Sequence, residues 1–179
     1  ISADAMVAGV EVFRGRLMAQ GGQVALRTVL LGTIQGDVHD IGKNLCNIML
    51  EGAGFEVIDL GVNTPPEKFI AAIQQHHPDI VGMSAFLTTT MPMFKVTIEA
   101  FKKAGLRDQI KVMVGGAPVT AHYAALAGAD AYCPDASSTA RKAKELIGAT
   151  GAAPSGALAD AVNAVEQMMS VAEPEEKKQ

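Results

Sequence analysis

The chain has 179 residues, enough for one domain with a sizeable core, and its 49% hydrophobic and 19% charged residues are typical of a soluble globular protein. The net charge is −4 and no run of basic residues interleaves with aromatic ones, so a nucleic-acid partner is not expected. No apolar stretch approaches the roughly 18 residues of a membrane-spanning helix, so no membrane partner is expected either.

A single amphipathic helix is predicted near the start of the chain. Apolar residues recur there at helical spacing, and a Gly-Gly pair then stops the helix. They are Met6, Val10, Phe13 and Leu17. Residues 1–24 precede the alternating strands and helices of the main domain, and one amphipathic helix cannot form a domain of its own.

Short apolar strands alternate with helical stretches from residue 27 onward. The first strand is predicted at residues 27–32 (RTVLLG), the first helix at 43–53 and the second strand at 55–60 (FEVIDL). Thr64 is the predicted N-cap of the next helix, which has proline at its first position and runs to about residue 75. The later elements are a strand at 79–84, a helix at 91–104, a strand at 110–114, a helix from about 118, a strand at 130–133 and a helix at 136–147.

This alternation predicts an α/β fold. With right-handed crossovers, the simplest topology is a flavodoxin-like, doubly wound, five-stranded parallel sheet of order 2-1-3-4-5. We expect residues 25–148 to form this domain, and residues 149–179 to be a flexible linker, a helix candidate at 157–171 and a charged tail. Ligands of such sheets bind beyond the carboxyl ends of the strands, at the switch point between strands 1 and 3. The loops after residues 32, 84 and 114 are therefore the expected site.

The loop after the first strand, GDVHDIGK at residues 36–43, has the residue types of a metal-ligand site. His39 lies where a histidine at a strand end can reach a ligand. Asp37 can accept the second ring N–H, an arrangement that fixes the tautomer of a metal-bound imidazole. Gly42 opens the next helix, where the missing side chain lets a bulky ligand approach the backbone. By itself, this DxHxxG pattern is a weak signal, because such a segment is more often an ordinary polar loop.

Two further elements lie at the selected strand ends. Ser84 ends the third strand, shortly before Phe86, and the pair Gly115-Gly116 ends the fourth. With these companions the sequence resembles the cobalamin-binding domain family, whose signature is DxHxxG, then SxL, then GG. The leucine of SxL is Phe86 here, and its larger ring predicts a narrower slot or a different lower base. The fuller string GDVHDIGKN resembles the methyltransferase branch of the family, which includes the methionine synthase cobalamin domain and the corrinoid proteins of methanol and methylamine methyl transfer.

The resemblance implies a bound cobalamin or related corrinoid that cycles between methyl-Co(III) and Co(I). Its benzimidazole would leave the cobalt and enter a deep slot, and His39 would become the metal's lower axial ligand. Asp37 and Thr90 would hold His39, so these three are the candidate catalytic residues. Ser84 would face the buried base and Thr88 would line the slot. The candidate cofactor-binding residues are Gly36, Asp37, Val38, His39, Asp40, Ile41, Gly42, Ser84, Phe86, Leu87, Thr88, Thr90, Gly115, Gly116, Asp135 and Ala136.

The resemblance further implies a methyl carrier rather than a complete enzyme. Its expected partners are a methyl-donor-specific methyltransferase, an acceptor methyltransferase of folate or thiol type, and a reductive activator. Since the family has a helical bundle before this domain, residues 1–24 are expected to be the last helix of a truncated N-terminal cap. Two isolated cysteines, Cys46 and Cys133, and the absence of a signal peptide predict a cytoplasmic protein.

Three alternatives remain open from the sequence. A cobalamin-dependent sensor or regulator would need a DNA-binding segment, for which no basic stretch is evident. The small subunit of an adenosylcobalamin mutase would share DxHxxG but usually differs around it. A flavodoxin-like FMN or nucleotide binder is the weakest alternative, because its phosphate loop would not need Asp37 and His39.

Overall fold

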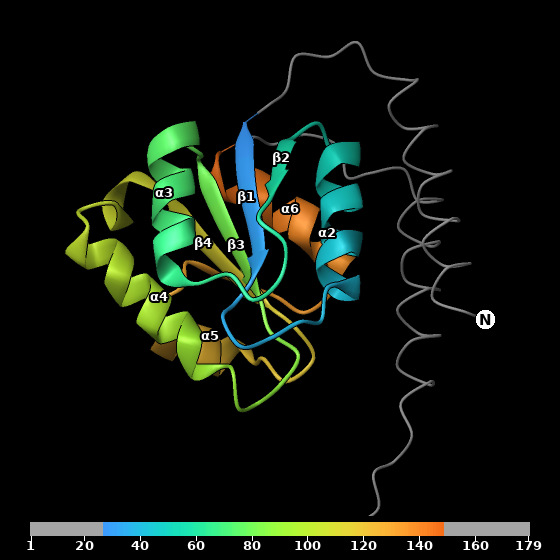
Figure 1. Ribbon diagram of the computed structural model, residues 1–179. Coiled ribbons are helices and arrows are strands. Elements are labelled where there is room, and N and C mark those ends of the chain that lie inside the picture. The colour runs from blue at the N-terminus through green and yellow to red at the C-terminus, as the bar shows by residue number, and fades with distance from the viewer. Residues whose placement is uncertain (1–26, 149–179) are drawn as a thin grey trace, which may run out of the picture.

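The computed structural model describes residues 27–148 (Figure 1), so the helices expected at 5–18 and 157–171 lie outside the described residues. No helix within residues 27–148 is long and apolar enough to cross a membrane. In chain order, the elements are β1 (Thr28–Thr33), α2 (Ile41–Gly52), β2 (Glu56–Asp59), α3 (Pro66–His76), β3 (Ile80–Ser84), α4 (Pro92–Lys103), the short 3-10 helix η1 (Arg107–Gln109), β4 (Lys111–Gly115), α5 (Ala121–Ala127), β5 (Ala131–Cys133) and α6 (Ala136–Leu146).

The strands form one parallel sheet of order β2-β1-β3-β4-β5, which confirms the predicted flavodoxin-like α/β fold. In this order, β2 lies on one side of β1 and β3 on the other, so the connections after β1 and β3 diverge at this point. The register brings their ends level, because Thr33 of β1 pairs with Ser84 of β3, which pairs with Gly115 of β4. The carboxyl ends of these three strands therefore meet at one edge of the sheet.

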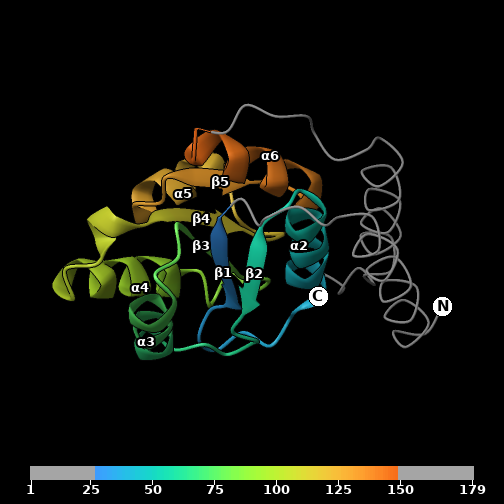
Figure 2. The same ribbon diagram turned by 90° about the horizontal axis from the view of Figure 1, so that it is seen from above.

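Helices cover both faces of the sheet (Figure 2). Helices α2 and α6 pack together on one face, and α3, α4 and α5 form the layer on the other. Along β1, Leu30 packs with Phe69 of α3, whereas Val29 and Leu31 pack with Leu50 of α2. Side chains of a strand alternate between its faces, and both faces are covered here, so β1 is buried along nearly its whole length. The two helix layers thus hold β1 and β3, whose ends carry the predicted site.

The start of α3 differs from the prediction, and Thr64 is not its N-cap. Pro65 occupies the N-cap position and Pro66 is the first helical residue. Thr64 is fully buried, and its hydroxyl donates to the backbone carbonyl of Leu60 at 3.4 Å. A parallel bridge between Ile34 and Thr64 draws this residue against the end of β1. The side chain is therefore used in the β2–α3 connection and does not cap the helix.

Two other helix starts were also predicted at the wrong residue. Helix α2 begins at Ile41 rather than at residue 43, with Asp40 at its N-cap position. Helix α5 begins at Ala121, a few residues later than predicted, because the Thr120 side chain caps it by accepting a backbone hydrogen bond. In α2, the shift places the first helical turn directly after the loop that contains the DxHxxG pattern.

Gly115 and Gly116 end β4 where two other backbone segments approach closely. A Cβ atom on Gly115 would lie 2.6 Å from the carbonyl oxygen of Cys133. On Gly116 it would lie 1.8 Å from the carbonyl oxygen of Ala85, and the φ angle of Gly116 is +127°, which residues with side chains rarely adopt. The packing of β4 against β5 and the β3–α4 loop therefore requires both glycines, whether or not a ligand lies nearby.

Replacing Gly116 by alanine is expected to lower the free energy of unfolding by more than about 2 kcal/mol, because it combines a backbone clash with a strained φ. Urea denaturation measures the loss. Gly42→Ala is the matched control, since nothing lies within 4 Å of its Cβ position and the residue is helical. We expect that control to keep or increase stability by up to about 1 kcal/mol. Equal stability of the two variants would contradict this account of the β4 end.

Candidate functional site

The predicted site loops meet at the carboxyl edge of the sheet, at the lower end of β1 and β3 in Figure 1. The loop after β1 contains Asp37 and His39, and the loop after β3 contains Phe86, Leu87 and Thr90. Hydrogen bonds join the two loops directly. Residues some fifty positions apart in the sequence thus form one cluster, at the switch point that the topology selects.

The carboxylate of Asp37 lies at the centre of this cluster and is fully buried. Its Oδ2 accepts hydrogen bonds from the backbone N–H groups of Phe86 (2.7 Å) and Leu87 (3.0 Å) and from the hydroxyl of Thr90 (2.9 Å). Its Oδ1 accepts the backbone N–H of His39 at 3.1 Å and lies 2.7 Å from the ring Nδ1 of the same residue. Both oxygens of a buried acid are therefore satisfied, as such a group requires.

These contacts keep Asp37 ionised. Burial by itself raises the pKa of this carboxyl group, but the hydrogen bonds from the Phe86 backbone, the His39 side chain and the backbones of His39 and Leu87 together lower it well below its ordinary value of 3.8. An ionised carboxylate can only accept hydrogen bonds. The proton between Asp37 and His39 must therefore lie on Nδ1 of the imidazole.

His39 consequently presents its other ring nitrogen outward. With Nδ1 protonated, Nε2 carries the free lone pair of the neutral ring. The His39 side chain is 45% exposed, and within residues 27–148 Nε2 has no hydrogen-bond partner. One face of the ring lies against Phe86, with 4.4 Å between ring centroids. In the neutral tautomer, the arrangement makes Nε2 the ring nitrogen that is available to a ligand.

Thr33 connects this loop to Ser84, and the sequence did not single it out. Its hydroxyl donates to the backbone carbonyl of His39 at 3.0 Å and lies 2.9 Å from the hydroxyl of Ser84. Since the single proton of Thr33 goes to His39, Ser84 is the donor of the pair between them. Thr33 is fully buried as the last residue of β1. Ser84 thus contacts the His39 loop through Thr33.

Asn63 is a second residue that the sequence did not reveal. Its side-chain oxygen accepts the backbone N–H of Gly36 at 2.8 Å, and its own N–H donates to the carbonyl of Asp37 at 2.8 Å. Asn63 has a φ of +48°, a left-handed conformation that asparagine tolerates better than most residues. An asparagine in the turn before Thr64-Pro65 was the only available signal. The β2–α3 connection therefore holds the start of the DxHxxG loop from the other side.

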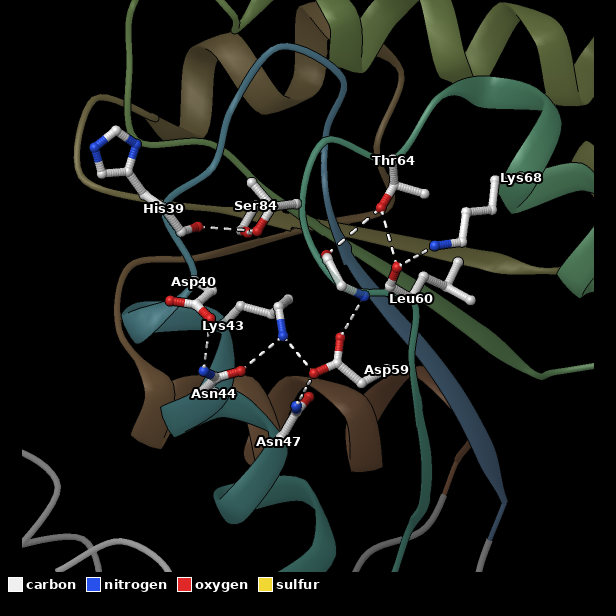
Figure 3. A network of polar contacts seen from close by, with 12 residues as sticks. His39, Asp40, Lys43, Asn44, Asn47, Asp59, Leu60, Thr64, Lys68 and Ser84 are labelled. Carbon is white, nitrogen blue, oxygen red and sulfur yellow. Dashed lines mark hydrogen bonds and ion pairs between the residues drawn. The ribbon is translucent and has the colours of Figure 1, made fainter. Parts of the chain in front are cut away.

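Lys43 anchors the end of the same loop (Figure 3). Its ammonium group is buried, with the side chain 2% exposed, and it forms an ion pair with Asp59 at the end of β2. The ammonium also donates to the side chain of Asn44 at 2.7 Å, and Asp59 accepts from Asn47 at 2.8 Å. A cation is disfavoured in the first turn of a helix, so Asp59 stabilises it there. In Figure 3 the His39 ring points away from this network.

Exposed apolar side chains gather on the two loops that surround His39. Val38 is 66% exposed, and Ile41, Phe86 and Leu87 are also exposed. Large apolar groups left in water are informative when they lie together on functional loops. Next to them, the Cβ position of Gly42 has no atom within 4 Å. The loops after β1 and β3 thus present exposed apolar side chains, and the start of α2 leaves open space at Gly42, which suits a bulky ligand with an apolar face.

The remaining candidate residues are connected less directly to His39. Thr88 is exposed on the β3–α4 loop, and the Asp40 side chain accepts from Asn44 at 3.2 Å. Asp135 caps α6 through a capping box with Ser138, and Ala136 is the first residue of that helix. These two lie at the carboxyl end of β5, and no hydrogen bond described for residues 27–148 joins them to the His39 cluster.

The potential metal ligands at this edge of the sheet suit a metal ion that is already coordinated by another molecule. Within residues 27–148, no three histidine, cysteine or acidic side chains gather closely enough to hold a metal ion. A free divalent ion in a protein usually takes several such ligands. His39 alone can supply one nitrogen, which matches the single axial position of a metal enclosed in a macrocycle.

Replacing Asp37 by asparagine tests the role of the buried carboxylate. At neutral pH we expect a loss of about 2–4 kcal/mol in the free energy of unfolding, because the amide cannot accept all the hydrogen bonds. Since the folded pKa of Asp37 is lowered, this stabilisation is present above the ordinary pKa of 3.8 and is lost as pH falls below it. The difference between wild type and variant should therefore shrink in acid, as measured by urea denaturation. Asp108→Asn, at an exposed carboxylate, is the control; a pH-independent difference at Asp37 would contradict the assignment.

Comparison with known proteins agrees with this geometry. The model of the B12 binding domain matches residues 27–144. Dimethylamine corrinoid protein 3 of Methanosarcina mazei is 44% identical over 147 residues, which span 82% of this chain and 88% of that protein. The structure of the monomethylamine corrinoid protein of Methanosarcina barkeri matches with a TM-score of 0.70 and 32% identity, over 79% of this chain and 67% of that one. The methanol:cobalamin methyltransferase complex of the same organism matches with a TM-score of 0.67 and 31% identity, over 85% of this chain and 57% of that one. The chain therefore belongs to the family of B12-binding domains.

Proposed function

We propose that this chain binds a corrinoid with the imidazole of His39 as the lower axial ligand of cobalt, and that it carries a methyl group between two methyltransferases. The observation that carries the proposal is the Asp37–His39 pair, which leaves Nε2 unpartnered among residues 27–148 on a side chain that is 45% exposed. In this arrangement the benzimidazole base of a bound cofactor would be displaced from the metal. A bound corrinoid supplies the chemistry, since reduced cobalt is a strong nucleophile towards methyl groups.

The residues of the two loops have separate tasks in this proposal. Asp37 holds the proton on Nδ1 and increases the basicity of Nε2. Thr90 and the Phe86 and Leu87 backbones keep the carboxylate ionised and in place. If the ring were released from a bound metal, Nε2 could take up a proton, and the ionised carboxylate would stabilise the resulting imidazolium. The pair would thus couple proton uptake to ligand release.

The apolar surface around His39 would support the underside of the macrocycle. Val38, Ile41 and Leu87 lose exposed apolar area when a flat ligand covers them, at roughly 25 cal/mol per Å². Gly42 leaves room for the ligand's edge over the first turn of α2. Ser84, which Thr33 contacts at the end of β3, would face the displaced base.

The relatives' names support methyltransferases as partners. They concern dimethylamine and monomethylamine corrinoid proteins and a methanol:cobalamin methyltransferase complex. Because these donors differ while the domain is similar, we place the choice of donor in the partner methyltransferase. An acceptor methyltransferase of folate or thiol type and a reductive activator complete the proposed cycle. The same relatives favour a methyl carrier over a cobalamin-dependent regulator or a mutase subunit.

Replacing His39 by alanine is the direct test of this function. We expect the wild-type chain mixed with cobalamin to leave a sizing column coloured, with the visible spectrum of a cobalt that has an axial nitrogen. His39→Ala should lose that spectrum, and its corrinoid affinity should fall about 10- to 100-fold, because the metal loses its protein ligand. His122→Ala, at an exposed histidine of α5, is the matched control. A colourless wild-type protein, or an unchanged spectrum in the alanine variant, would refute the proposal.

A further inference from the structure

The aromatic ring of Phe86 lies face to face with the imidazole of His39. The ring centroids are 4.4 Å apart and the planes meet at 29°, which is a stacked contact. Phe86 is 38% exposed and the His39 side chain 45%, so the contact lies at the rim of the site rather than in the core. A contact in this position contributes little to the stability of the fold. The contact instead affects the orientation of the imidazole.

Asp37 and Phe86 restrain the imidazole in different ways. The 2.7 Å hydrogen bond to Asp37 fixes the position of one ring atom, Nδ1. Rotation of a histidine ring about its Cβ–Cγ bond is a broad torsion, so one hydrogen bond still allows the ring to rock. The flat face of Phe86 blocks that rocking on one side. The two contacts together determine where the Nε2 lone pair points.

Phe86 is itself fixed by the same carboxylate. Its backbone N–H donates to Oδ2 of Asp37 at 2.7 Å, while Oδ1 of that residue holds His39. The phenyl ring and the imidazole are therefore tied to the two oxygens of one buried group. A leucine at position 86 would keep apolar bulk but would have no flat face to stack on the ring. The aromatic side chain is thus the part that orients His39.

We infer that Phe86 is a positioning residue, which preorganises the imidazole of His39 for axial coordination of a corrinoid's cobalt. This inference rests on the proposed function. It adds a residue that affects what fraction of the bound cobalt is coordinated by His39. Stacked ring pairs shift an equilibrium by about two- to tenfold beyond simple burial. Phe86 therefore raises the ratio of His-bound to His-free cobalt by that factor.

The test uses the full chain with Phe86→Ala, with Phe86→Tyr as the rescue variant and with Leu126→Ala as the control, at an exposed apolar residue of α5. In the cofactor-free protein, NMR of the His39 ring protons reports the stack, because a facing aromatic ring shifts their signals upfield. In protein that carries 15N-labelled histidine, is loaded with cobalamin and is reduced to Co(II), electron paramagnetic resonance gives the fraction of cobalt bound to a histidine nitrogen, because a 15N ligand splits each line into a doublet and the cofactor's own base into a triplet. Thermal unfolding checks that each variant is folded.

We expect Phe86→Ala to abolish the upfield shift and to lower the His-bound to His-free ratio about two- to tenfold. Phe86→Tyr should restore both, and Leu126→Ala should change neither. The inference is overturned if the wild-type His39 signals show no upfield shift, or if the alanine variant binds cobalt through a histidine nitrogen as fully as the wild type. In that second case the proposed function stands. Loss of the axial nitrogen in the wild type itself would remove both.

Discussion

The buried carboxylate of Asp37 holds the loops after β1 and β3 together, and the arrangement of the site depends on it. A fully buried acid is tolerated only when its oxygens accept enough hydrogen bonds, and here those bonds come from the backbones of Phe86 and Leu87, the hydroxyl of Thr90, and His39. The same contacts that offset the cost of burial therefore also set the geometry of the imidazole. An ionised Asp37 requires the proton on Nδ1 of His39, so Nε2 has the available lone pair in the neutral tautomer. The stability of the site and the orientation of its metal-binding imidazole thus both depend on the Asp37 carboxylate.

The fold supplies this group with two rigid supports. Strands β1 and β3 lie side by side in the middle of the sheet, buried between the helix layers, and the register brings their last residues level. On one side Asn63 holds the backbone of Gly36 and Asp37, and on the other the Lys43–Asp59 ion pair fixes the first turn of α2. The loop that presents His39 is therefore held at its start, its centre and its end. Such restraint is what a site needs in order to keep a ligand in one orientation.

Much of this arrangement could be predicted from the sequence. Each predicted strand limit lies within one residue of the observed one, because runs such as RTVLLG and FEVIDL are apolar or β-branched and are bounded by glycine or polar residues. That the loops after β1 and β3 form the site followed from the rule that ligands bind at a switch point. That Thr90 joins Asp37 and His39 followed from the resemblance to the cobalamin-binding family. The contacts of Lys43 and Thr64 could not be predicted in this way. A lysine in the first turn of a helix is typical of an exposed side chain, and only the tertiary structure shows Lys43 buried against Asp59. Thr64 was predicted to cap a helix because its bridge to Ile34 depends on the strand register, which the sequence does not show.

The central claim is that the cobalt of a bound corrinoid takes its lower nitrogen from His39. Electron paramagnetic resonance of the Co(II) form tests it most directly, with protein produced in cells that are supplied with 15N-labelled histidine. If His39 is the ligand, the nitrogen splitting of each cobalt line changes from a triplet to a doublet. A triplet that persists in the labelled protein would mean that the cofactor's own base remains on the metal, and would contradict this account of the site.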